Sequence, residues 1–226
     1  MRDGTSSGTA RLYAAEFLGT AILVFFAAGS VMVCAMLGDL PGPLISGAAS
    51  GLALMILIWA LFDISGAHFN PALTLGLAAF GDFPKRLVPG YLVAQLAGSF
   101  AGAALLYYTL GAQGSMGANL PNLALPLSLP GIFVIECALS FVMMLVILAA
   151  FAAEAPLRHF AAIPIGITVG IEVMLMGPVA GAAMNPARAF GPTAFLGDWQ
   201  YYWIYALGPV IGILAAGWVW RCLKAS

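Results

Sequence analysis

The chain has 226 residues, of which 62% are hydrophobic and only 8% are charged, and its formal net charge is −1. Soluble globular domains carry about 25% charged residues, so this composition excludes a water-soluble fold and predicts an integral membrane protein. The near-neutral charge gives no indication of a nucleic-acid partner. Apolar runs contain or flank the three cysteines, which favours buried thiols over a disulfide framework.

Apolar runs long enough to cross a bilayer as helices occur six times. Such a span needs about 20 mostly apolar residues. In chain order the predicted spans are residues 14–37, 44–62, 87–110, 131–153, 160–176 and 201–220. The stretch 111–130 has no charged residue, is rich in Gly, Asn and Pro, and is predicted to be an irregular loop.

One short motif occurs twice, at positions 115 residues apart. The two copies are Asn70-Pro71-Ala72 and Asn185-Pro186-Ala187. Asn favours the N-cap and Pro the first turn of a helix, so each copy predicts a short helix, 71–80 and 186–195, with Gly81 and Gly197 as stop signals. About ten helical residues span roughly 15 Å, half of the hydrocarbon thickness. Pro192 is expected to end the second helix early or to kink it.

The two halves of the chain match each other. Each half contains three spans and one half-helix, and Glu16 and Glu136 occupy similar places in spans one and four. An odd number of spans inverts the second half, so we expect an all-α polytopic membrane protein with inverted repeats at about 10–110 and 131–222, joined by 111–130. The half-helices then enter from opposite faces and meet at their N-termini. Such segments require a protein-lined, wet interior, which predicts a single channel domain over residues 1–226.

The basic residues indicate the orientation. Seven of the eight Lys and Arg fall on one face, which should be cytoplasmic. They are Arg2, Arg11, Lys85, Arg86, Arg158, Arg221 and Lys224. Both termini are therefore expected in the cytoplasm, with the chain in a plasma (inner) membrane and in contact with lipid. The eighth is Arg188, which follows the second motif and is expected to be functional.

At these residues the chain resembles an aquaporin of the major intrinsic protein family. The resemblance covers the six spans, Ser65-Gly66-Ala67-His68-Phe69-Asn70-Pro71-Ala72, Asn185-Pro186-Ala187-Arg188, and the pair Glu16 and Glu136. It implies a homotetramer with one pore per subunit that passes water or small uncharged solutes passively. It also implies that both glutamates brace the re-entrant loops by accepting backbone N–H groups. For His68, a polar contact beside the pore and a loop-bracing hydrogen bond remain equally open.

The motifs predict how the pore works. Helix N-termini carry roughly +0.5 charge each, so two of them converging at mid-bilayer repel cations, including hydronium. Asn70 and Asn185 can donate to a passing water while their oxygens cap the helices. These donations interrupt the hydrogen-bonded chain of waters along which protons would hop. Arg188 adds a fixed positive charge and several donors at an outer constriction.

By the family's spacing, the constriction positions are Ser50, Val173, Ala182 and Arg188. The first three are small, whereas water-selective members carry bulky residues at two of these positions. The chain is therefore more similar to the solute-permeable branches, the nodulin-like and aquaglyceroporin types. We expect a channel for water and for glycerol, urea, hydrogen peroxide or undissociated metalloid acids.

Two other functions are alternatives to this channel. A strict water channel is the first, and an ion-coupled secondary transporter the second, although the centre offers amides instead of a titratable group. No enzyme, cofactor or metal site is expected, because Ser65 and His68 have no third group with which to build a triad. Glu172, next to Val173, is left open to face a loop, a neighbouring subunit or the pore.

Overall fold

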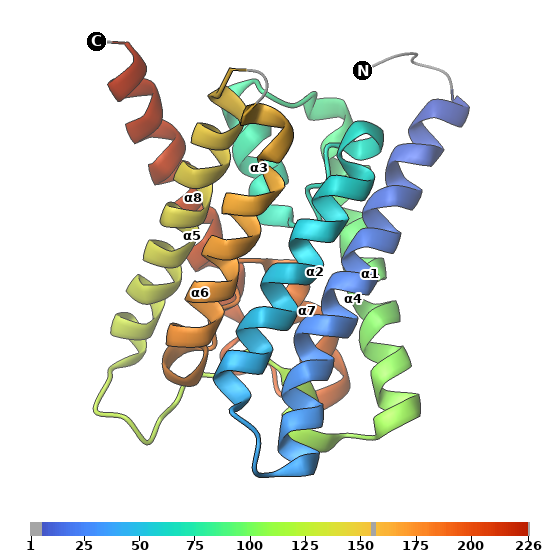
Figure 1. Ribbon diagram of the computed structural model, residues 1–226, viewed down its shortest axis with the longest axis vertical. Coiled ribbons are helices and arrows are strands. Elements are labelled where there is room, and N and C mark those ends of the chain that lie inside the picture. Colours follow the sequence, from blue (N-terminus) through green and yellow to red (C-terminus); the bar gives the residue numbers. More distant parts are fainter. Residues whose placement is uncertain (1–5, 155–156, 226) are drawn as a thin grey trace.

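The computed structural model describes residues 6–154 and 157–225, and this part of the chain forms a helical bundle (Figure 1). Within it, six helices are long and apolar enough to cross a membrane, as predicted. They are α1 (Ser6–Leu37), α2 (Gly42–Ser65), α4 (Val88–Leu110), α5 (Leu129–Ala152), α6 (Ala162–Ala180) and α8 (Tyr202–Lys224). Arg2, used above to predict the orientation, lies outside the described residues.

Two shorter helices follow the repeated motif. Helix α3 (Pro71–Phe80) has the predicted bounds and ends at Gly81, which adopts a left-handed φ of 83°. Helix α7 (Pro186–Leu196) continues past Pro192, so the prediction of an early end is wrong. The reason is packing against α4, where the Gly191 N–H donates to Ser99 Oγ at 2.8 Å. That contact supports the turn containing the proline.

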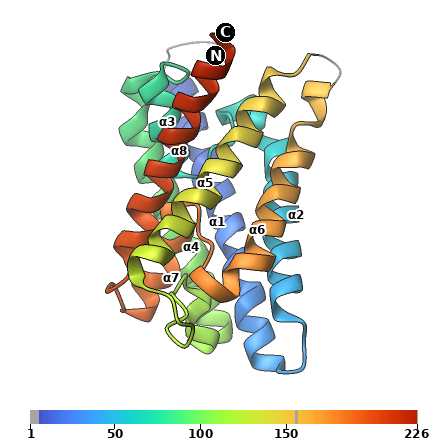
Figure 2. The same ribbon diagram turned by 90° about the vertical axis from the view of Figure 1, so that its left-hand side faces the viewer.

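The long helices surround the short ones. Helix α1 packs against α2 and α4, α5 packs against α6 and α8, and α2 packs against α6. Inside this ring α3 contacts α8, and α7 contacts α4. Helix α3 occupies one half of the bundle and α7 the other, and the start of α1 and the end of α8 lie at the α3 end (Figures 1 and 2).

Glycines allow the long helices to cross closely. A Cβ at Gly98 in α4 would stand 2.2 Å from the Phe17 carbonyl oxygen of α1. In α8, a Cβ at Gly212 would stand 2.1 Å from the Cys137 carbonyl oxygen of α5. Small residues at such crossings are typical of membrane bundles, because close backbone approach gives van der Waals contact that lipid cannot supply.

The connection 111–130 is not a plain surface loop. It contains a short 3₁₀ segment, η2 (Gln113–Gly117), which packs against α1 and α7. Met116 is fully buried, in a cluster with Val24 and Leu106. Two other 3₁₀ turns, η1 (Lys85–Leu87) and η3 (Leu157–Phe160), precede α4 and α6. The predicted irregular loop thus forms part of the interior.

Candidate pore and selectivity region

The two motifs lie against each other at their N-termini. Asn70 Oδ1 accepts from the N–H of Ala72 at 2.9 Å, and Asn185 Oδ1 accepts from the N–H of Ala187 at 2.9 Å. The amide nitrogens reach across, since Asn70 Nδ2 donates to the Met184 carbonyl at 2.9 Å and Asn185 Nδ2 donates to the Phe69 carbonyl at 2.8 Å. An amide NH₂ has two hydrogens, so each asparagine retains one for the cavity that both line.

The residues before each motif adopt a conformation that L-residues avoid. Ala67 and Phe69 have φ of 51° and 48°, and Ala182 and Met184 have φ of 47° and 53°. A non-glycine residue in this region costs of the order of 1–2 kcal/mol. The strain therefore needs support from surrounding contacts.

Glu16 supplies that support in the first half of the chain. Its side chain is fully buried, and its carboxylate accepts from four donors. These are Ser65 Oγ at 2.6 Å, the His68 N–H at 3.0 Å, the Phe69 N–H at 2.7 Å and Gln95 Nε2 at 2.8 Å. The carboxylate of α1 thereby holds the loop that leads into α3.

Glu136 plays the matching part in the second half of the chain, with backbone donors. Its carboxylate accepts from the N–H groups of Ala183 at 3.0 Å and Met184 at 3.1 Å. Two tyrosines also support the loops before the motifs. Tyr91 Oη donates to the Ser65 carbonyl, and Tyr205 Oη donates to the Ala180 carbonyl. Neither contact was predicted from the sequence. These tyrosines are 114 positions apart, and that offset, which also relates spans three and six, was the signal that could have found them.

His68 makes both contacts that the sequence left open. It lines the cavity, and its Nδ1 lies 3.0 Å from Thr74 Oγ1 in the second turn of α3. Thr74 also receives a hydrogen bond from Gln95 Nε2. The imidazole is therefore held in the network that surrounds Glu16.

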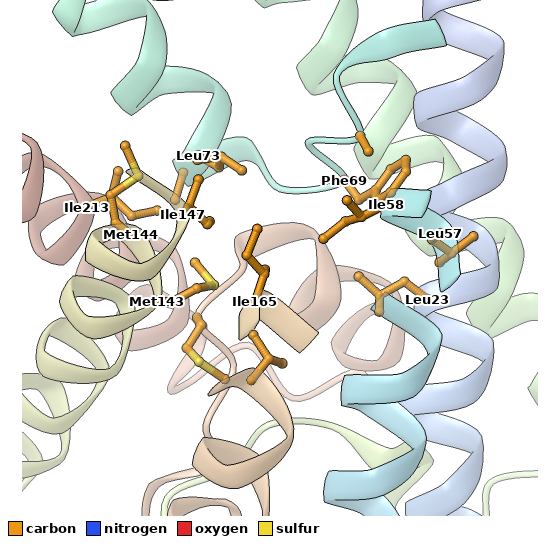
Figure 3. Packing of buried hydrophobic residues seen from close by; sticks show 14 of the residues in the cluster. Leu23, Leu57, Ile58, Phe69, Leu73, Met143, Met144, Ile147, Ile165 and Ile213 are labelled. Atoms are coloured by element: carbon orange, nitrogen blue, oxygen red, sulfur yellow. The ribbon is translucent and has the colours of Figure 1, made fainter. Parts of the chain in front are cut away.

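A cavity of about 600 Å³ runs alongside both motifs. Its walls are mainly apolar, and Ile58, Leu73, Met143, Ile147 and Ile165 converge on it from both halves of the chain (Figure 3). The four predicted constriction positions are also among the lining residues. These are Ser50, Val173, Ala182 and Arg188.

Arg188 is anchored by backbone oxygens. Its Nη1 donates to the Gly117 carbonyl at 2.7 Å, and its Nη2 donates to the Ala27 carbonyl at 3.4 Å. Gly117, in η2, was missed by sequence reasoning, because a backbone acceptor carries no residue signature. Asn119 Nδ2 donates to the Gly181 carbonyl at 2.7 Å, beside Ala182. The connecting segment thus contacts two parts of the predicted constriction.

Gly117→Ala should disturb this anchor. Gly117 has a φ of 60°, and an added Cβ would stand 2.4 Å from the Ala28 carbonyl oxygen, so the segment must shift away from α1. We expect the freed guanidinium to enter the passage, and water and glycerol flux in proteoliposomes to fall on the order of tenfold. Ser115→Gly, which relieves a φ of 51° in the same segment, is the control and should retain flux. Equal flux in both variants would contradict the anchoring role.

Glu172 does not belong to the cavity. It is 7% exposed and is not among the described residues that line the lumen. Within residues 6–154 and 157–225, neither carboxylate oxygen has a hydrogen-bond partner. Of the three orientations left open, the one facing the pore is therefore wrong.

Two short helices that meet at their N-termini beside a cavity, enclosed by six membrane-spanning helices, are the architecture of a polytopic membrane channel. Residues 4–220 match the family model described as Major intrinsic protein, so the chain belongs to that family. The family predicted from the repeated motifs is confirmed.

Named relatives and a solved structure agree with this assignment. Aquaporin NIP1-4 of Oryza sativa subsp. japonica is 37% identical over 213 residues, covering 94% of this chain and 76% of the relative. Probable aquaporin AqpM of Archaeoglobus fulgidus is 36% identical over 243 residues, covering 95% of this chain and 97% of the relative. The aquaglyceroporin from Plasmodium falciparum superposes with a TM-score of 0.83 at 24% identity, over 94% of this chain and 95% of that one. The fold is therefore shared.

Proposed function

We propose that the protein is a passive channel for water and small uncharged solutes, such as glycerol, urea, hydrogen peroxide or undissociated metalloid acids, and that it excludes ions and protons. The observation that carries the proposal is the meeting of two helix N-termini, each capped by an asparagine, beside one continuous cavity. The relatives named as aquaporins support the same class of function. No enzymatic activity is part of the proposal.

Charge exclusion arises at the centre. The N-termini of α3 and α7 each contribute roughly +0.5 charge, directed at the position where Asn70 and Asn185 line the cavity. A water there accepts from both remaining amide hydrogens and directs its own hydrogens away. It cannot then accept a proton from its neighbour, so a chain of waters is interrupted while single molecules pass.

Solute selection arises beside Arg188. The guanidinium offers donors to a hydroxyl or carbonyl oxygen, and the small side chains of Ser50, Val173 and Ala182 leave room for a solute larger than water. A neutral solute replaces its lost hydration with these bonds. A cation is repelled, and an anion that reaches Arg188 meets apolar walls further along.

The arrangement of the chain in its membrane is also proposed. Residues 10–110 and 131–222 form inverted repeats of a single domain, which the matching contacts of Tyr91 and Tyr205 support. The α3 end faces the cytoplasm with both termini, in a plasma (inner) membrane, and four channels assemble as a homotetramer. Membership of the major intrinsic protein family supports the homotetramer.

Stopped-flow light scattering on proteoliposomes tests the function. We expect protein-dependent flux of water, glycerol and urea without any ion gradient. Water flux alone would favour the strict water channel, and solute flux that requires a sodium or proton gradient would favour an ion-coupled transporter. Absence of all flux would defeat the proposal.

A further inference from the structure

The cavity differs greatly between its two ends. Arg188 shares its end with small side chains, whereas the end beside the α3 C-terminus is lined by Phe62, Phe80, Phe151 and Trp220. These four come from the C-terminal parts of α2, α3, α5 and α8, which lie at the same end of the bundle (Figures 1 and 2). We name this group the aromatic mouth.

Two of its rings are stacked between separate helices. Phe62 of α2 and Phe151 of α5 have ring centroids 4.6 Å apart and an interplanar angle of 11°. Both helices pack against α6, so the stack joins the α2 and α5 walls of the lumen at this end. Stacking of this kind stabilises the relative position of the two rings.

Phe80 is fixed separately, at the end of α3. The Arg221 guanidinium lies 4.9 Å from its ring centroid. On another side the ring packs so closely on Gly217 that a Cβ there would stand 2.1 Å from Phe80 Cε2. Both contacts place the ring against α8, so the mouth has aromatic surfaces contributed by several helices.

Aromatic rings at a pore mouth select solutes by other properties than Arg188 does. A phenyl ring offers no hydrogen bond in exchange for lost water, so a solute can cross only through the space that the rings leave beside the stack, and wider solutes are excluded. The ion pair between Asp82 and Arg221, with an N–O distance of 3.4 Å, lies at the same end. Its two opposite charges cancel, so the pair adds no net charge to the mouth. Size and hydration are therefore the properties that this end can discriminate.

We propose that the aromatic mouth is a second selectivity barrier, in which the stacked Phe62–Phe151 pair sets the upper size limit for neutral polyols. The inference rests on the proposed function, because it assumes that polyols enter the pore at all. The mouth thereby adds an upper size limit to the rejection of charge at the centre and the solute selection beside Arg188.

Polyol permeability of variant channels tests the proposal. Phe62→Ala, Phe151→Ala and the double variant are reconstituted at equal density, and flux is measured for glycerol, erythritol and xylitol. We expect the xylitol-to-glycerol permeability ratio to rise on the order of tenfold in each single variant, with little further gain in the double variant, because either change opens the stack. Phe62→Trp should act in the opposite direction and lower glycerol flux more than water flux.

The matched control is Phe100→Ala. Phe100 is 48% exposed and forms a ring pair with Phe195, 4.9 Å between centroids, outside the described cavity lining. Its polyol ratio should equal that of the wild type. If the alanine variants do not assemble, Phe151→Leu keeps an apolar side chain but removes the stacked ring and is smaller than phenylalanine, so it should still raise the ratio. An unchanged ratio in variants that conduct glycerol would overturn the second barrier alone, whereas a wild type that conducts no polyol would overturn the polyol conduction of the proposed function, on which the inference rests.

Discussion

Arg188→Val is expected to weaken the rejection of protons and cations and to raise the flux of urea. The wild-type guanidinium is held at the cavity wall by the Gly117 and Ala27 carbonyls. A unit charge about 7 Å from a passing cation, at an effective dielectric constant of about 40, contributes about 1.2 kcal/mol, so its removal should raise cation leak about sevenfold. The measurement is the decay of a pH gradient in proteoliposomes, alongside urea flux.

Arg188→Lys separates charge from anchoring. Lysine keeps the positive charge but lacks the fork that reaches two carbonyls, so it should retain proton rejection while its solute flux changes. If Arg188→Val rejects protons as well as the wild type does, the charge is not part of the barrier, and rejection rests on the centre alone.

Glu16→Leu is expected to have the largest effect on stability. The substitution removes the acceptor of four buried donors, and each donor left unsatisfied costs about 1–3 kcal/mol. The free energy of unfolding should therefore fall by about 4 kcal/mol or more, and the strained residues Ala67 and Phe69 lose their support. Thermal unfolding in detergent, followed by tryptophan fluorescence, measures the loss.

Glu136→Leu is the matched comparison in the second half of the chain. Glu136 accepts from the N–H groups of Ala183 and Met184, and in the part of the chain that the structure describes it has no side-chain donors like Ser65 and Gln95, which donate to Glu16. Its substitution should therefore lower the unfolding temperature by less than Glu16→Leu does. Equal losses would mean that the extra contacts of Glu16 contribute nothing measurable.

Much of the fold follows from local signals in the sequence. The bounds of α3 were predictable because Asn70 caps its start and Gly81 takes the left-handed turn at its end. The six spans were predictable from length and apolarity. The prediction that Pro192 ends α7 early was wrong, because the contact between Gly191 and Ser99 in another helix outweighed the local preference of the proline.

The surroundings of Arg188 could not be predicted in the same way. Its acceptors are backbone oxygens of Gly117 and Ala27, and any residue type offers such an oxygen. The burial of Met116 depends on docking of η2 against α1, for which the uncharged stretch 111–130 gives no periodic signal. Contacts between distant segments thus complete a site whose central residues the sequence alone suggests.

Simultaneous measurement of glycerol and proton flux in the same proteoliposomes tests the central claim most directly. A pH-sensitive dye inside the vesicles reports protons, and light scattering reports glycerol. We predict rapid, protein-dependent glycerol entry while an imposed pH gradient decays no faster than in empty vesicles, because two helix N-termini and two asparagine amides reject hydronium at the centre. Decay of the pH gradient that rises with protein density in step with glycerol entry would contradict the account.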